Sequence, residues 1–287
     1  MGASKNKSLR IGIQGVRASF HEVAARKFFP NVIQPIECAS FSRLSEVLKN
    51  KDADLCVMAI ENSIAGSILT NYSLMESNGF KIVGEVYLRI EMNLMALPGQ
   101  KIKDIHSVQS HPMALLQCSD FLAEHPHMSV VEATDTADSA KLIAKKKLKN
   151  HAAIASALAA EAYDLEILEA GIESNKQNYT RFLVICRKED YKRPHDANKA
   201  SIRFESAHKP GSLAAILDVF SKEAVNMTKI QSVPILGRPY EYSFHVDLEW
   251  EDFDRYQNAL EKLKNNLSLV SNLIHFGNYP QGERPLL

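Results

Sequence analysis

The sequence has few cysteines, no excess of charge and no long apolar run. Its cysteines, Cys38, Cys56, Cys118 and Cys186, fit neither a CxxC motif nor a dense disulfide scaffold. Lys and Arg number 34, as do Asp and Glu, which removes any bulk attraction to nucleic acid or an anionic membrane. No apolar run approaches the roughly 18 residues of a membrane span, and the polar N-terminus lacks a secretory signal's apolar segment. We expect a cytoplasmic protein with reduced cysteines and with neither a nucleic-acid nor a membrane partner.

Standard catalytic and phosphate-binding motifs are also missing. Residues 12–15 follow a predicted strand but do not form GxGxxG, and the sequence contains no GxxxxGK[ST]. The 10 histidines form neither HExxH nor a Cys/His zinc pattern, and there is no GxSxG elbow. These absences disfavour nucleotide-binding, zinc-enzyme and hydrolase functions, and we expect no metal and no cofactor.

The chain of 287 residues is long enough for roughly two domains. Up to about residue 187, short apolar runs alternate with helical patterns, which favours an α/β fold with a mostly parallel sheet. The run 55–60 is continuously apolar, as expected for a strand buried on both faces. Residues 19–22 match a capping box at a helix start, and residues 111–124 predict one helix with Ser110 as its N-cap.

The composition changes over residues 188–198, a polar stretch with Pro194 that is typical of a linker. The predicted order of elements after it is βαββαβ, the ferredoxin-like arrangement. The predicted strands are 200–205, 227–233, 240–249 and 272–277, and the predicted helices are 211–223 and 252–265.

Three polar segments lie at the ends of predicted strands, where open α/β sheets bind ligands. They are residues 61–63 (Glu-Asn-Ser), residues 110–112 (Ser-His-Pro) with Gln117, and residues 178–182 (Asn-Tyr-Thr-Arg-Phe). Each segment alone fits a helix cap, a turn or an exposed strand end.

Together, these segments resemble the signature segments of prephenate dehydratase, in that family's order and at suitable spacing. Residues 15–25 resemble its glycine-led first βα turn, although Val16, Ala18 and His21 replace the commoner Pro, Gly and Ser. The C-terminal unit is similar to the ACT regulatory domain of the same enzymes, through residues 210–213 (Pro-Gly-Ser-Leu) and 226–234. The resemblance covers about residues 9–280.

The resemblance implies a two-lobed catalytic domain, like a type II periplasmic binding protein, joined to an ACT domain. The implied limits are 9–187 for the catalytic domain (subdomains of about 9–88 plus 181–187, and 89–178), 188–198 for the linker and 199–280 for the ACT domain. Lobed folds of this kind also serve as mere solute binders, so the fold alone does not establish a function.

The resemblance also implies a reaction, the decarboxylative dehydration of prephenate to phenylpyruvate in L-phenylalanine biosynthesis. Aromatisation drives the joint loss of CO2 and water, and no electron sink or metal is required. The protein must hold two carboxylates, exclude water and assist the departing hydroxide. Two alternatives stay open: an arogenate dehydratase, whose substrate carries an amino group in place of the side-chain keto oxygen, and a non-catalytic amino-acid-sensing binding protein.

The matched segments imply Thr180, Arg181 and Glu61 as catalytic residues. Thr180 can donate a hydrogen bond to the leaving hydroxyl, and Arg181 can grip a carboxylate with its planar fork. Glu61 is either a protonated acid or a residue that orients its neighbours. The implied substrate-binding residues are Asn62, Ser63, Ser110, Gln117 and Phe182.

The ACT resemblance implies feedback inhibition by L-phenylalanine and assembly as a homodimer or homotetramer. The implied effector-binding residues are Gly211, Ser212, Leu213, Asn226, Gln231 and Ser232. Backbone donors at the glycine-led helix start would take the effector's carboxylate. The family's usual Glu-Ser-Arg-Pro reads Gln-Ser-Val-Pro at 231–234, so a charge pair is missing and coupling to the catalytic cleft would weaken. The alternative is an ACT unit kept only for dimerisation.

Overall fold

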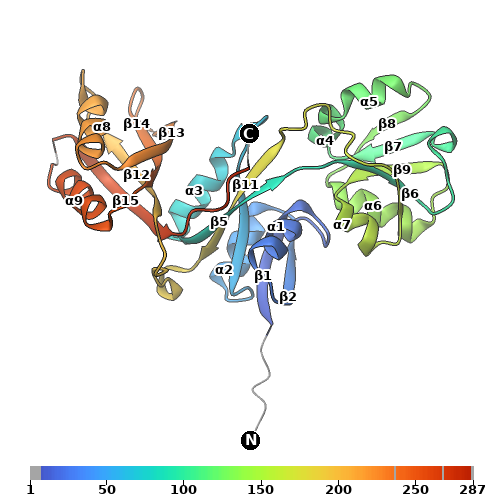
Figure 1. Ribbon diagram of the computed structural model, residues 1–287, viewed down its shortest axis with the longest axis horizontal. Helices are drawn as coiled ribbons and strands as arrows, with labels where there is room; N and C mark the ends of the chain where they lie inside the picture. Colours follow the sequence, from blue (N-terminus) through green and yellow to red (C-terminus); the bar gives the residue numbers. More distant parts are fainter. Residues whose placement is uncertain (1–7, 236, 267, 286–287) are drawn as a thin grey trace, which may run out of the picture. The chain divides into compact units, whose positions relative to one another are not determined.

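The computed structural model describes residues 8–235, 237–266 and 268–285. These residues fall into two compact units (Figure 1). The first unit comprises the described parts of Met1–Leu74, Val86–Phe182 and Arg284–Leu287, and the second comprises Met75–Glu85 and Leu183–Glu283. The division passes through strands β5 (Lys81–Arg89) and β11 (Tyr179–Cys186). The domain limits expected from the sequence, at 187 and 199, stay predictions.

The first sheet has the order β2-β1-β3-β11-β5, with the short β4 paired to β3. Its other elements are β1 (Leu9–Gln14), α1 (Phe20–Phe28), β2 (Ile33–Cys38), α2 (Phe41–Lys49), β3 (Leu55–Asn62), β4 (Gly66–Ser67) and α3 (Leu69–Asn78). Strand β1 pairs in parallel with both β2 and β3. The apolar residues 56–60 of β3 are buried, as expected for a strand covered on both faces.

The second sheet has the order β10-β6-β9-β7-β8. Its elements are β6 (Asn93–Ala96), β7 (Ser107–Ser110), α4 (Pro112–Gln117), α5 (Ser119–Glu124), β8 (Ser129–Glu132), α6 (Thr136–Lys146), β9 (His151–Ala155), α7 (Ala157–Ala162) and β10 (Glu166–Glu169). Strand β7 is parallel to β8 and β9, whereas β6 is antiparallel to β9 and β10. Read from β8, the second sheet repeats the arrangement that the first has from β2. In each sheet the first strand of a βαβαβ run (β1 or β7) lies between the second (β2 or β8) and the third (β3 or β9). This repeat confirms the expected two-lobed α/β fold.

The predicted helix over residues 111–124 is broken in the structure. It ends at Gln117 and restarts after Cys118, because the backbone N–H of Ser174 donates to the carbonyl of Gln117 at 2.8 Å. The predicted N-cap is also wrong. The cap of α4 is His111, whose Nδ1 accepts from the N–H of Met113 at 3.2 Å, while Ser110 ends β7. Strands β4 and β10 had no counterpart among the elements predicted from the sequence.

The C-terminal elements form the predicted βαββαβ order. They are β12 (Lys199–Ser206), α8 (Ser212–Lys222), β13 (Asn226–Pro234), β14 (Tyr242–Glu249), α9 (Phe253–Lys264) and β15 (Val270–Tyr279). The sheet order is β13-β14-β12-β15, with antiparallel pairs throughout. Helices α8 and α9 pack on the sheet over an apolar core that includes Phe204, Ile216 and Leu260 (Figure 1). The ferredoxin-like prediction is confirmed.

A buried charge cluster marks the start of β12. Lys199 is 1% exposed, and its Nζ lies 2.9 Å from Glu85 Oε1 and 3.1 Å from Glu249 Oε1. Glu85 Oε1 also accepts from the backbone N–H of Gly282 at 3.0 Å. The buried ammonium group of Lys199 thus pairs with the buried carboxylate of Glu85 and the half-buried carboxylate of Glu249.

We expect Lys199→Met to lower the free energy of unfolding by about 3–5 kcal/mol, because it removes the ammonium group that pairs with the buried Glu85 carboxylate. Lys222→Met is the matched control, since Lys222 is exposed and its pair with Asp218 is worth at most about 0.5 kcal/mol. Denaturant titration of both variants measures the difference. Equal stabilities would show that the Lys199 cluster contributes nothing.

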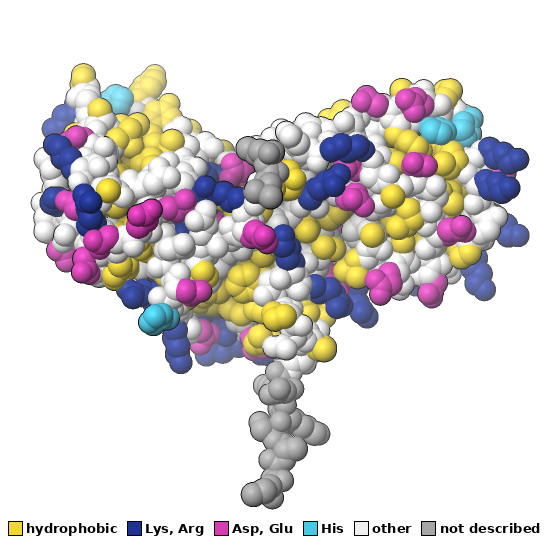
Figure 2. Space-filling model, in the orientation of Figure 1, with side chains coloured by type: hydrophobic (Ala, Val, Ile, Leu, Met, Phe, Trp, Pro, Cys, Tyr) yellow, Lys and Arg dark blue, Asp and Glu magenta, His cyan; other side chains and the backbone are white. Residues whose placement is uncertain are grey.

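The surface of the described residues carries mixed charge. Figure 2 shows Lys and Arg side chains interspersed with Asp and Glu over the visible face. No helix in the described part of the chain is long and apolar enough to cross a membrane. Cys38, Cys56, Cys118 and Cys186 are buried free thiols.

Candidate active site

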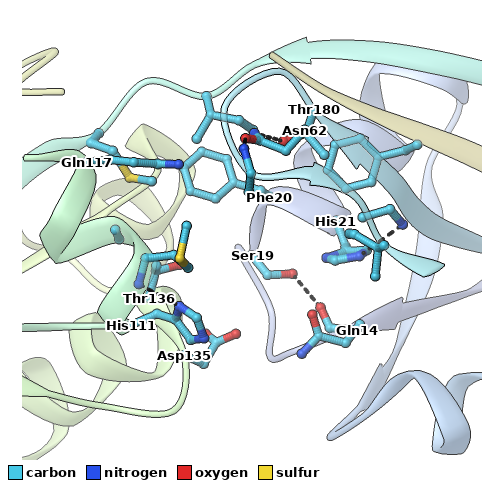
Figure 3. A pocket seen from close by; sticks show the side chains of 18 of the residues that line it. Gln14, Ser19, Phe20, His21, Asn62, His111, Gln117, Asp135, Thr136 and Thr180 are labelled. Atoms are coloured by element: carbon cyan, nitrogen blue, oxygen red, sulfur yellow. Dashed lines mark hydrogen bonds between the residues drawn. The ribbon is translucent and has the colours of Figure 1, made fainter. Parts of the chain in front are cut away.

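A cavity of about 370 Å³ lies in the first unit. Polar side chains that follow β1, β3, β7 and β8 meet there with residues at the start of β11 (Figure 3). The polar part of the wall consists of Gln14, Ser19, His21, Asn62, His111, Gln117, Thr134, Asp135, Thr136 and Thr180. Its larger apolar side chains are Phe20, Phe41, Ile68, Ile90, Met92, Met113 and Phe182. The size and the mixture of wall types suit a small molecule with an apolar body and polar ends.

The amide of Asn62 is held in one orientation. Its Oδ1 accepts from the backbone N–H groups of Ile64 at 2.9 Å and Ala65 at 2.8 Å. Its Nδ2 must then point the other way, where it donates to Asn178 Oδ1 at 2.8 Å and to Thr180 Oγ1 at 2.9 Å. Because Thr180 Oγ1 accepts from this amide, its own proton is left for another acceptor.

The same chain of hydrogen bonds orients Gln117. Asn178 is fully buried, and its Nδ2 donates to Gln117 Oε1 at 2.9 Å. With that oxygen occupied, Gln117 keeps the donors of its Nε2 for the cavity. The fixed backbone at residues 64 and 65 thus sets the direction of donation through three side chains. The result is a wall that offers hydrogen-bond donors to oxygen atoms of a ligand.

Helix α1 begins at the cavity wall. Ser19 is its N-cap, but the Ser19 hydroxyl donates to the carbonyl of Gln14 at 3.2 Å and makes no capping bond. Neither bond of the predicted capping box forms, because the Ser19 hydroxyl points to Gln14 and Glu22 reaches back to the N–H of Ala18 at 2.7 Å instead of that of Ser19. The N–H groups at a helix start carry partial positive charge, so this end of α1 can bind a carboxylate.

His21 supports the wall as a neutral side chain. Burial lowers its pKa to about 3. Its Nε2 accepts from the backbone N–H of Ala59 at 3.4 Å, and its ring packs edge-on against Phe182 with centroids 5.0 Å apart. At neutral pH this imidazole has no proton to give beyond its single N–H, which argues against a role as general acid.

Asp135 brings a carboxylate to the cavity. It is the N-cap of α6, and its Oδ1 accepts from the N–H of Asp138 at 2.9 Å. Burial raises the pKa of Asp135, an effect that hydrogen bonds from the backbone N–H groups of Asp138 and Ala137 partly offset. Gly15 lies against it with φ +92°, and a Cβ there would come within 2.6 Å of Asp135 Oδ2. Only glycine suits both this backbone conformation and this close approach.

Four of the site residues expected from the sequence meet at the cavity. Asn62, Gln117, Thr180 and Phe182 all line its wall, although the first and the last two are far apart in sequence. Thr180 and Phe182 face it together because they are two residues apart on β11. The structure establishes their positions, and the catalytic role of Thr180 and the substrate-binding roles of the other three stay predictions.

Arg181 does not line the cavity. It lies between Thr180 and Phe182 on β11, so its side chain points to the opposite face of the sheet. There it is 4% exposed, with its guanidinium carbon 5.9 Å from the centre of the Tyr87 ring. The expectation that Arg181 grips a substrate carboxylate therefore has no support in this geometry.

Three further expected residues also lie outside the wall. The Ser110 hydroxyl donates to the carbonyl of Ile154 at 2.6 Å, which ties β7 to β9. Ser63 Oγ donates to Gln177 O and accepts from the N–H of Tyr179, both at 2.9 Å. Glu61 is half-buried and pairs in register with Ser67 of β4. Ser63 and Ser110 thus support neighbouring backbone.

The wall contains residues that sequence reasoning did not select. They are Gln14, Ser19, His21, Thr134, Asp135 and Thr136. His111 also lines the wall and belonged to a selected segment without an assigned role. The segment 134–136 comes directly after β8. The rule that ligands bind beyond the carboxyl ends of strands could therefore have selected this segment as well. Asn178, which joins Gln117 to Asn62, was part of a selected segment without an assigned role.

A second pocket lies in the C-terminal unit, at the start of α8. Residues 206–214 line it together with Tyr242 and Phe244. Gly211 is the N-cap of α8 with φ +81°, and a Cβ there would meet no atom within 4 Å. The expected effector residues Gly211, Ser212 and Leu213 therefore line one pocket. The other three, Asn226, Gln231 and Ser232, lie on β13 outside its wall.

The fold and the cavity define a two-lobed α/β protein with a cavity sized for a small molecule, and a ferredoxin-like unit with a pocket of its own. The family model of prephenate dehydratase matches residues 11–190. The chain belongs to the prephenate dehydratase family.

Known proteins similar to this chain include members of the family and one structure with a different description. The chain is 38% identical to "Arogenate dehydratase/prephenate dehydratase 6, chloroplastic" of Arabidopsis thaliana, over 97% of this chain and 70% of the relative. A prephenate dehydratase from Arthrobacter aurescens, solved in complex with L-Phe, superposes with a TM-score of 0.83 at 26% identity, covering 95% of this chain and 90% of the other. A structure described as GqqA, a novel type of quorum quenching acylase, superposes with a TM-score of 0.84 at 28% identity, covering 95% and 98%.

Proposed function

We propose that this protein catalyses the decarboxylative dehydration of a prephenate-type cyclohexadienol for L-phenylalanine biosynthesis. Prephenate would yield phenylpyruvate, and arogenate would yield L-phenylalanine. The observation that carries the proposal is the Thr180 hydroxyl, which accepts from Asn62 and so keeps its proton for the cavity. Membership of the family supports the reaction class, and relatives are named for both substrates.

In this reaction the bond between the ring and its carboxylate breaks, and its electron pair enters the ring. The bond between the ring and the hydroxyl oxygen breaks at the opposite carbon, and hydroxide leaves as water after gaining a proton. Thr180 lies where it can donate a hydrogen bond to this leaving oxygen. A threonine hydroxyl is too weak an acid to ionise freely, so it acts by hydrogen bonding or by donation concerted with bond breaking.

The remaining wall binds the substrate and excludes water. The amide of Gln117 and the start of α1 offer donors to the substrate carboxylates without adding a formal positive charge. Phe20, Phe41 and Met92 supply an apolar surface for the ring. Exclusion of water strengthens each of these polar contacts, because the local dielectric constant falls.

The direct test incubates the purified full chain with prephenate and, separately, with arogenate. The proposal predicts phenylpyruvate from the first or L-phenylalanine from the second, above the spontaneous rate. The alternative, a non-catalytic amino-acid-sensing protein, predicts that ligands bind in calorimetry while neither product accumulates. That outcome would replace the catalytic proposal.

L-phenylalanine as feedback inhibitor is the corresponding proposal for the second unit. The start of α8 offers backbone donors for the ligand's carboxylate, and Phe244 and Leu213 give its ring an apolar surface. The L-Phe complex of a structural relative supports this choice of ligand. A homodimer or homotetramer and a cytoplasmic location stay predictions, the first checked by sedimentation and the second by cell fractionation.

We expect L-phenylalanine to bind at millimolar concentration or below, and Gly211→Asp to weaken it by about 10-fold or more. Asp tolerates the left-handed conformation better than most residues, and its carboxylate would occupy the N–H groups that the ligand needs. Calorimetric titration measures both constants. If the unchanged protein gives no heat and its activity does not respond, the second unit has a purely structural role.

A further inference from the structure

The cavity has a negative end. Figure 3 shows Asp135 and His111 on the side of the cavity opposite Thr180 and Asn62. Among the described residues that line the cavity, Asp135 is the single carboxylate, and none is Lys or Arg. A substrate with two carboxylates would meet this wall without a compensating cationic side chain.

The Asp135 carboxylate is held in place with one oxygen committed and the other turned to the β1–α1 loop. Oδ1 accepts from the N–H of Asp138 as the cap of α6. Oδ2 lies beside Gly15, so close that a Cβ at Gly15 would come within 2.6 Å of it. The loop thus lies close to Oδ2, the backbone N–H groups of Ala137 and Asp138 hold the carboxylate, and an oxygen with two lone pairs keeps the capacity to accept from a ligand.

We propose that Asp135 is a specificity-determining residue that binds a side-chain ammonium group, so that the protein prefers the amino acid arogenate to the keto acid prephenate. This proposal rests on the proposed function. In both substrates the hydroxyl and the three-carbon side chain are attached to opposite carbons of the ring. With the hydroxyl at Thr180, the side chain reaches the end of the cavity where Asp135 lies.

The side chains of prephenate and arogenate would interact differently with the Asp135 carboxylate. A keto oxygen is an acceptor, and beside Asp135 it would leave two acceptors facing each other out of water. An ammonium group donates three hydrogen bonds and pairs with the carboxylate, which gives a charge-assisted contact. Arogenate also carries one negative charge fewer, which suits a wall without Lys or Arg.

His111 extends this recognition to the whole amino acid group. Its Nδ1 accepts from the N–H of Met113, which leaves the N–H on Nε2 to donate to the side-chain carboxylate. Asp135 and His111 together would bind an ammonium and a carboxylate on one carbon. The amino group passes through the reaction unchanged: the ring loses CO2 and hydroxide, the hydroxide gains one proton, and L-phenylalanine results.

The test compares kcat/KM for arogenate and prephenate in the full chain and in two variants. Asp135→Asn removes the charge but keeps a side chain that caps a helix, so α6 is retained. Asp138→Asn is the matched control, since it removes the same charge from the same helix turn at a residue outside the cavity wall. Thermal unfolding checks that both variants fold.

We expect the unchanged protein to prefer arogenate, and Asp135→Asn to lower kcat/KM for arogenate by about 10- to 100-fold, mainly through KM, which is the range for a charge-assisted hydrogen bond. The same variant should raise kcat/KM for prephenate, because a negative charge has gone. A preference for prephenate, or equal losses for both substrates in Asp135→Asn, would overturn the inference and leave Asp135 as a helix cap. Turnover of neither substrate by the unchanged protein would instead overturn the proposed function.

Discussion

Thr180→Val is expected to lower kcat by about 10²- to 10⁴-fold, the usual contribution of a positioned proton donor. Valine keeps the shape of threonine and removes the hydroxyl, so the loss would report the chemistry of the leaving group. Asn62 Nδ2 would keep Asn178 Oδ1 at 2.8 Å and the carbonyl of Tyr179 at 3.3 Å as acceptors, which limits the structural damage.

Thr180→Ser is the control for this prediction, because it keeps the hydroxyl and should retain most of the activity. Single-turnover kinetics separate the chemical step from product release in all three proteins. A Thr180→Val protein with a chemical step within about 3-fold of the unchanged rate would remove the hydroxyl from the mechanism, since a positioned proton transfer is worth far more.

Asn62→Asp is expected to lower kcat by about 10²-fold or more without unfolding the protein. One carboxylate oxygen can still accept from the N–H groups of Ile64 and Ala65. The other would accept from the Thr180 hydroxyl and so turn its proton away from the leaving group. It would also face the oxygen of Asn178 and add negative charge beside an anionic substrate.

The matched control is Asn175→Asp. Asn175 is exposed, and its Oδ1 accepts from the N–H of Gln177 at 2.9 Å, so the substitution adds the same charge while an oxygen remains to accept that bond. Steady-state kinetics with circular dichroism on both variants measure the effect. Similar kcat values for Asn62→Asp and Asn175→Asp would show that the direction of the Asn62 amide does not matter.

Local sequence patterns predicted the fold well where an element depends on its own residues. The apolar run of β3 and the βαββαβ order after residue 198 were both read from periodicity, and the structure confirms them. The break at Cys118 was not predictable in this way, because it follows from a bond between Ser174 and the end of α4. Such a contact appears only once the chain is folded.

The candidate site shows the same division. The rule that ligands meet strand ends selected Asn62, Gln117 and Thr180, which the structure brings together. It misplaced Arg181, although the period of two in a strand already implies that Thr180 and Arg181 point to opposite faces. The bond that Asn62 donates to Asn178 spans 116 residues, and no local pattern contains it.

Isotope release is the most direct measurement of decarboxylative dehydration at the Thr180 end of the cavity. The substrates are prephenate and arogenate labelled with ¹³C in the ring carboxylate, each incubated with the unchanged protein and with Thr180→Val. We expect labelled CO2 and aromatic product in equal amounts, at a rate proportional to protein concentration. In Thr180→Val this rate should be strongly reduced. Release of labelled CO2 from both substrates at no more than the spontaneous rate would contradict this expectation.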